Sequence, residues 1–95
     1  MTPMTREDAQ VVALQAVGFL AGTDDLVSVF MGATGIGRED LVTGIDTPEV
    51  QAAVLDFVLM DDQWVLAFAE ETGRPPETVA LARAALPGGD DRHWT

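Results

Sequence analysis

The chain has 95 residues and no cysteine, so it fits one domain and excludes disulfides, zinc–thiolate sites and cysteine nucleophiles. It has 16 acidic residues, five arginines and no lysine, which gives a formal net charge of −11. This charge repels phosphate backbones and anionic lipid surfaces, so we expect no nucleic acid and no membrane partner. Solubility alone also explains the charge, and a basic or neutral protein partner is compatible with it.

The compartment follows from what the N-terminal segment lacks. Residues 1–10 have neither the basic region nor the apolar region of a signal peptide, and no apolar run is long enough to cross a membrane. We therefore expect a cytoplasmic protein with one helical domain over residues 1–95. Residues 87–95 form a predicted tail, since Pro87, Gly88 and Gly89 end regular structure.

The first predicted helix begins at Thr5, a hydroxyl cap that stands three residues before the carboxylate of Asp8. Acidic residues fill its first turn, where they favour the helix dipole. Gly22 ends it. Its apolar face consists of residues at helical spacing: Ala9, Val12, Ala13, Ala16, Phe19 and Leu20.

A second helix is predicted to restart at once, with Thr23 as its cap and with Asp24 and Asp25 in its first turn. Gly32 is predicted to end it, and residues 32–37 form a loop because of their glycine content. The apolar stripe of this helix is Leu26, Val27, Phe30 and Met31.

The middle of the chain carries a short helix and then the clearest helix start in the sequence. The short helix covers residues 38–43 with Gly44 behind it. Asp46 and Thr47 then offer capping side chains before Pro48 at the first helical position. Val50, Ala53, Val54, Phe57 and Val58 give the buried face of the helix that follows.

The pair Asp61 and Asp62 leaves two interpretations open for residues 48–72. Either one helix runs to Thr72, or Asp61 caps a new helix, with Met60 and Val65 placed as a hydrophobic staple. Two carboxylates inside an apolar stretch favour the break. Residues 64–68 are apolar around most of a helix, so we expect this segment to be central and place residues 50–68 at the centre of the fold.

The last helix is predicted to start at Pro75 and Pro76, and no segment requires a strand. The sequence therefore predicts an all-α fold, a compact bundle of five or six short helices. The apolar positions of the last helix are Val79, Leu81, Ala82, Ala85 and Leu86.

Three glycines, Gly32, Gly35 and Gly37, resemble two phosphate-binding loops. Their spacing is one residue shorter than the loop of short-chain dehydrogenases, and no second strand–helix unit follows. The hairpin of helix–hairpin–helix proteins needs basic residues nearby, whereas Glu39 and Asp40 follow here. A glycine linker between two short helices is the simpler interpretation.

Paired aspartates occur at residues 24–25, 61–62 and 90–91, and such pairs can bind divalent cations. Two of the pairs stand at predicted helix starts, where capping explains them. His93 is the only histidine and Ser28 the only serine, so no nucleophile–base pair is indicated. We assign no catalytic, cofactor-binding or metal-ligating residue, and we expect no enzyme.

Three stretches resemble one family: residues 30–36, residues 53–65 and residues 84–89. The run from Val54 to Asp61 is the most specific part. The family comprises small acidic proteins, mainly alphaproteobacterial, that share a domain of unknown function. The resemblance implies a short single-domain protein in a bacterial cytoplasm, and it names no functional residue.

The leading hypothesis is a protein-interaction module, for which self-association as a homodimer is one form. Short helices in a small bundle leave apolar surface to be covered. Trp94 either folds back onto the bundle or anchors a partner chain. The alternative is a small-molecule or divalent-metal-binding domain that uses the acidic pairs. The candidate interaction surface is Val27, Met31, Leu59 and Trp94.

Overall fold

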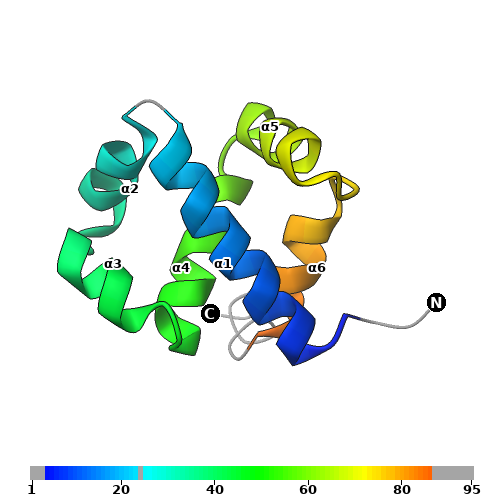
Figure 1. Cartoon of the computed structure of the whole chain (residues 1–95), viewed down its shortest axis with the longest axis horizontal. Coiled ribbons are helices and arrows are strands. Elements are labelled where there is room, and N and C mark those ends of the chain that lie inside the picture. Colours follow the sequence, from blue (N-terminus) through cyan, green and yellow to red (C-terminus); the bar gives the residue numbers. More distant parts are fainter. Residues whose placement is uncertain (1–3, 24, 87–95) are drawn as a thin grey trace, which may run out of the picture.

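Helices make up the regular structure of residues 4–23 and 25–86, which are the residues that the computed structural model describes (Figure 1). Within these ranges there are six helices and no strand, which confirms the predicted all-α bundle. The tail at residues 87–95, and with it Trp94, lies outside the described residues. The helices are α1 (Arg6–Gly22), α2 (Leu26–Thr34), α3 (Arg38–Gly44), α4 (Pro48–Leu59), α5 (Asp62–Thr72) and α6 (Thr78–Ala85).

The bundle is organised around α1 and α4. Helix α1 crosses in front of α4 and α6, while α2 and α3 lie on one side of this layer and α5 closes the other (Figure 1). The face of α1 toward these helices carries Ala9, Ala13 and Ala16, all without exposed surface. Their small side chains let the helix backbones approach closely. The predicted buried face of α1 is therefore confirmed at every position.

Helix starts with a side-chain cap match the sequence. The Thr5 hydroxyl accepts the Asp8 amide at 3.1 Å, and the Thr47 hydroxyl accepts the Val50 amide at 3.4 Å. A carboxylate oxygen of Asp61 accepts the amide of Gln63 at 2.8 Å. The chain thus breaks between α4 and α5, which settles the alternative left open for residues 48–72.

The predicted start and end of the second helix are wrong. The Thr23 hydroxyl donates to the carbonyl of Phe19 at 2.7 Å, so Thr23 completes α1. Helix α2 begins after Asp25, which adopts a left-handed conformation with φ of +60° and makes no side-chain cap. Gly32 lies inside α2, and the helix ends at Gly35, whose φ of +78° suits a residue without Cβ.

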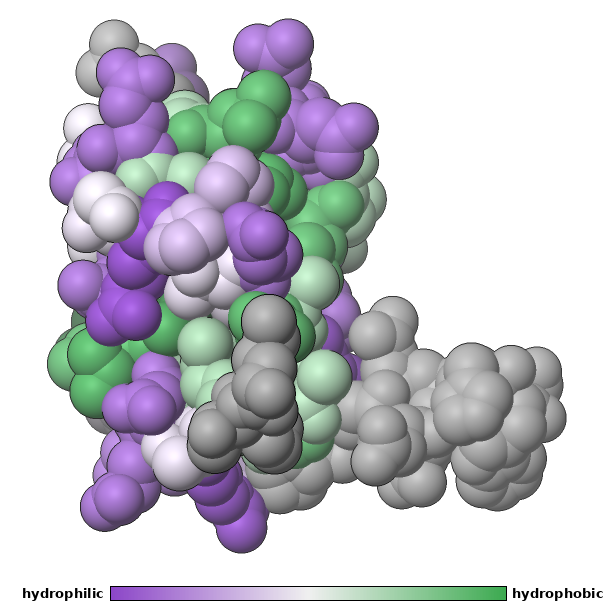
Figure 2. Space-filling view, turned by 90° about the vertical axis from the view of Figure 1, so that its right-hand side faces the viewer, coloured by the Kyte–Doolittle hydropathy of each residue, from purple (hydrophilic) through white to green (hydrophobic). Residues whose placement is uncertain are grey.

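Helix α5 is peripheral, contrary to the prediction of a central segment. Only Phe68 and Ala69 are buried on it, while Leu66 is 55% exposed. Hydrophobic residues accordingly reach the surface in the upper part of the face shown in Figure 2, where α5 lies. Met60 is 72% exposed, so it forms no staple with Val65. The central role falls to α4, which contacts every other helix.

The start of the last helix is also corrected. Pro75 and Pro76 belong to a turn, in which the amide of Thr78 donates to the carbonyl of Pro75 at 3.0 Å. Helix α6 begins only at Thr78. Leu81, a predicted core position, is 43% exposed, because Val79, Ala82 and Arg83 form the buried face.

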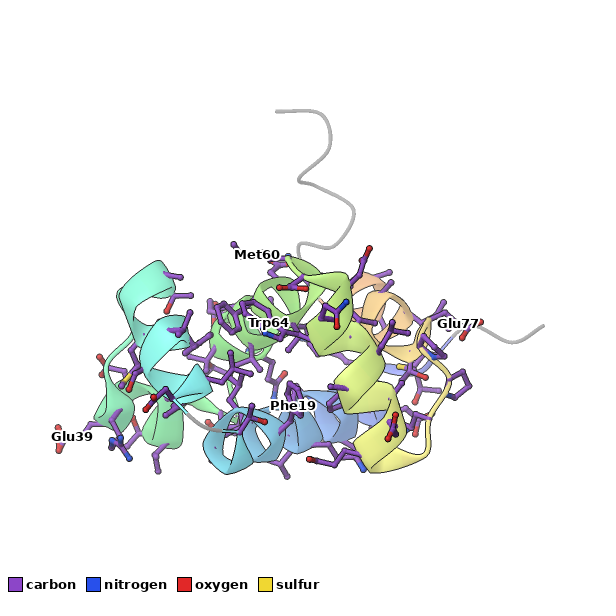
Figure 3. The ribbon with its side chains drawn as sticks, turned by 90° about the horizontal axis from the view of Figure 1, so that it is seen from above. Phe19, Glu39, Met60, Trp64 and Glu77 are labelled. Atoms are coloured by element: carbon purple, nitrogen blue, oxygen red, sulfur yellow. The ribbon has the colours of Figure 1, made fainter. Side chains whose placement is uncertain are left out.

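Aromatic rings connect the helices in the core. Phe57 of α4 packs edge-on against Phe30 of α2 with ring centroids 5.3 Å apart. On its other side Phe57 stacks on Trp64 of α5 at 4.6 Å. Phe19 of α1 meets Phe68 of α5 at 5.7 Å, and Figure 3 shows Phe19 and Trp64 directed into the space between the helices. These contacts hold the peripheral helices against α1 and α4.

Candidate binding cleft

The outer face of α1 carries two exposed apolar side chains. Val11 is 49% exposed and Leu14 is 58% exposed, and both lie away from the stripe that enters the core. They are three positions apart and therefore neighbours on one helix face. Two neighbouring exposed aliphatic groups on a helix whose other side is buried form a candidate contact surface.

These side chains form one wall of a cleft of about 390 Å³. The opposite wall is the connection between α3 and α4 together with the first turn of α4. The surface of the cleft is largely apolar. Its lining residues are Glu7, Gln10, Val11 and Leu14 of α1, Ile45 and Asp46 of the connection, and Gln51 of α4.

The connection between α3 and α4 is held by short-range contacts. The Thr47 hydroxyl donates to the carbonyl of Gly44 at 2.6 Å, and it also caps α4. A Cβ at Gly44 would stand 2.7 Å from Cγ2 of Val50, so only glycine fits this turn without displacing α4. The tight turn presents Ile45 and Asp46 to the cleft.

Gln51 joins this turn to the floor of the cleft. Its side chain is almost fully buried, at 3% exposure, and its Nε2 donates to the carbonyl of Ile45 at 2.8 Å. Because a carbonyl can only accept, this bond fixes which amide atom is nitrogen. The other amide atom, Oε1, is buried and has no hydrogen-bond partner among the residues described. The buried side chain of Gln51 therefore fixes the turn that forms this wall of the cleft.

Both charged residues of the cleft are acidic. Glu7 and Asp46 are exposed carboxylates at its margin, and the remaining lining side chains are uncharged. An apolar surface beside two carboxylates favours an occupant that combines an apolar group with a positive charge.

The residues predicted as an interaction surface are not gathered at this cleft. Val27 and Met31 of α2 and Leu59 of α4 are half-buried and pack against the core. The sequence interpretation missed Val11 and Leu14. Their signal was present, since both are apolar residues of the first helix that fall outside its core stripe.

The acidic pairs do not assemble into a cluster. Asp61 and Asp62 occupy the cap and the first position of α5, as predicted from capping. Asp24, Asp90 and Asp91 lie outside the described residues. Over residues 4–23 and 25–86, no group of three acidic, histidine or cysteine side chains is placed to hold a metal ion.

An ion pair lies apart from the cleft, between α4 and α6. Nε of Arg83 stands 2.9 Å from a carboxylate oxygen of Asp56. The Arg83 side chain is 10% exposed and that of Asp56 is 35% exposed. Nη1 of Arg83 is buried without a hydrogen-bond partner in the described part of the chain. The pair ties the last helix to the central one.

The length and hydropathy of the helices decide whether any of them could span a membrane. No single helix in the described ranges is long and apolar enough to cross a membrane. By length and composition alone, α1 and α2 reach that threshold only as a pair bent by 116°.

Comparison with known proteins gives one match. A family model described as "Protein of unknown function (DUF3572)" matches residues 6–89, which include all six helices and the cleft. No curated protein and no solved structure matches the chain.

Proposed function

The chain belongs to the DUF3572 family of proteins of unknown function, and we propose that it is a protein-interaction module whose cleft receives a basic, apolar segment of a partner protein. The observation that carries the proposal is that Val11 and Leu14 are exposed in a cleft that also contains the carboxylates of Glu7 and Asp46. Partner segments of this kind bind through apolar anchors at helical spacing, with charge fixing orientation and register.

The charge of the chain favours a partner of a different sequence over a second copy. Two copies each carrying −11 repel one another. A basic segment is instead attracted, and it meets Glu7 and Asp46 where its apolar groups meet Leu14. The proposal includes the bacterial cytoplasm as the setting, which rests on the family resemblance.

A second candidate function is binding of a small organic cation in the same cleft. Its volume of about 390 Å³ falls within the usual range for ligand sites, roughly 300–1,000 Å³. The largely apolar lining and the two carboxylates favour this candidate, because together they suit a cation that carries an apolar group. In residues 4–23 and 25–86 no group of three acidic, histidine or cysteine side chains is placed to hold a divalent cation.

The test uses a designed peptide with leucine and lysine at helical spacing, and its leucine–glutamate counterpart as the control for charge. Binding is followed by titration calorimetry at low and moderate salt. We expect the basic peptide to bind, more weakly at higher salt, and the acidic peptide not to bind. Binding of both peptides equally, or of neither, contradicts the proposal.

Matched variants locate the binding. Leu14→Glu puts a charge into the cleft, whereas Leu66→Glu changes an equally exposed leucine on α5, 55% against 58%. We expect the first variant to lose peptide binding at least tenfold and the second to keep it. Both side chains are exposed, so neither change disturbs the core. Small primary and quaternary amines, titrated in parallel, separate the two candidates, since only the second predicts that they bind and displace the peptide.

A further inference from the structure

The apolar lining of the cleft continues onto the exposed side of α3. Val42 of this helix is 65% exposed. It stands three positions before Ile45, which lines the cleft and keeps the helical backbone conformation of α3. Residues three positions apart are neighbours on the surface of a helix. Val42 therefore adjoins the wall of the cleft to which Ile45 belongs.

The order of side chains around α3 shows on which side Val42 lies. Leu41 is buried, Ile45 is half-buried and Val42 is exposed. At about 3.6 residues per turn, Ile45 follows Leu41 by about 40° around the helix axis, and Val42 follows it by about 100° in the same sense. The side of α3 that leaves the core thus passes first through Ile45, at the cleft, and then through Val42, in solvent.

We propose that the partner segment binds as a basic amphipathic helix, with one apolar side chain in the cleft against Leu14 and Ile45 and the next one on Val42. This inference rests on the proposed function, because it takes the cleft as the first contact. The positive charge of the helix belongs at the cleft, where the carboxylates of Glu7 and Asp46 stand. Val42 adds a second contact outside the cleft.

The size of the cleft and the spacing of the two contacts support a helix in this position. A helix is roughly 10–12 Å across with its side chains, too wide for a cleft of about 390 Å³. Only single side chains can enter, so the rest of the helix must lie on the adjoining surface. Apolar side chains three or four positions apart on a helix are about 5–6 Å apart. Val42 and Ile45 have this same spacing on α3, so two consecutive apolar side chains of the partner reach both.

The second contact also separates a helical partner from a small organic cation. Val42 is not one of the lining residues, so a cation held within the cleft does not touch it. A partner helix that extends beyond the cleft does. Dependence of binding on Val42 is therefore expected for the helix alone.

The experiment measures the affinity of the leucine–lysine peptide for Val42→Ala by titration calorimetry. We expect binding to weaken about fivefold, because two methyl groups leave the contact. The control is Val29→Ala, the same change at a valine that is 48% exposed on α2, a helix that contributes no residue to the cleft. It should leave the affinity unchanged. Alanine favours a helix more than valine does, so neither change weakens the fold, which circular dichroism checks.

A double-mutant cycle then tests whether the partner meets Val42 through one side chain. The terminal leucines of the peptide are replaced by alanine, one at a time. For one of these peptides the effect of Val42→Ala should largely disappear, since its apolar side chain opposite Val42 is already missing. An effect of Val42→Ala that is the same for all peptides overturns the inference.

Other outcomes separate this inference from the proposed function. If Leu14→Glu weakens peptide binding but Val42→Ala does not, the second contact is overturned and the function stands. Equal losses in Val42→Ala and Val29→Ala also overturn it, as does weaker binding of small amines to Val42→Ala. A protein that binds no peptide contradicts the function and the inference together.

Discussion

Nε2 of Gln51 donates a 2.8 Å hydrogen bond to the carbonyl of Ile45, six positions earlier in the chain. The bond joins the first turn of α4 to the α3–α4 connection. Oε1 of the same amide is buried and has no partner among the described residues. One side chain thus closes the turn beside the cleft.

Replacing Gln51 by Met should lower the free energy of unfolding by about 1 kcal/mol. The lost hydrogen bond and the Ile45 carbonyl left without it cost roughly 1–2 kcal/mol, and removal of the unpaired oxygen offsets part of that loss. Urea denaturation measures the change. Gln10→Met, in the same cleft, is the control and should stay within about 0.5 kcal/mol. Equal effects of the two changes would mean that the Gln51–Ile45 bond does not stabilise the turn.

Two glycine substitutions should have opposite effects. A Cβ at Gly18, inside α1, meets nothing within 4 Å, so Gly18→Ala should stabilise the protein by about 0.5–1 kcal/mol. A Cβ at Gly44 would press on Val50 at 2.7 Å, so Gly44→Ala should destabilise it. Thermal unfolding followed by circular dichroism checks both. A gain in melting temperature for Gly44→Ala would contradict the described turn.

Removing either partner of the ion pair between α4 and α6 should lower the free energy of unfolding, but by different amounts. Asp56→Ala leaves the buried guanidinium of Arg83 without its carboxylate and should lower the free energy of unfolding by about 2 kcal/mol. Arg83→Met should cost less, because Met keeps the buried stem and the remaining carboxylate is partly hydrated. Glu71→Ala, on the exposed face of α5, is the neutral control. The reverse order in urea denaturation would refute this assignment.

The protein should be a monomer in dilute solution at low ionic strength, since copies with a charge of −11 repel each other. Light scattering coupled to size exclusion measures the mass. A stable dimer that persists at low salt would contradict the preference for a basic partner, and would favour the homodimer as the form of the interaction module.

Local capping made much of the fold predictable. Thr5, Thr47 and Asp61 cap helices through contacts within three residues. The sequence predicted the starts at Thr5 and Pro48, and it favoured the start at Asp61 while leaving one continuous helix open. The prediction that Thr23 starts the second helix was wrong because a threonine hydroxyl can bond at the end of one helix as well as at the start of the next. The prediction that Gly32 ends the second helix was wrong because an exposed glycine can lie within a helix whose other residues pack into the core.

The candidate site depended on tertiary contacts that sequence does not specify. The apolar character of Val11 and Leu14 was visible, but the wall opposite them comes from residues more than 30 positions away. The burial of Gln51 and its unpaired oxygen likewise follow from how α4 packs under the turn. Val27, Met31 and Leu59, the described residues of the predicted surface, are half-buried against the core, and their role in an interaction stays a prediction.

The most direct test of the cleft as a binding site is the affinity of the leucine–lysine peptide for Leu14→Glu compared with Leu66→Glu. The proposed function predicts at least a tenfold loss for the variant in the cleft and unchanged affinity for the variant on α5. Equal affinities for the two variants would contradict it.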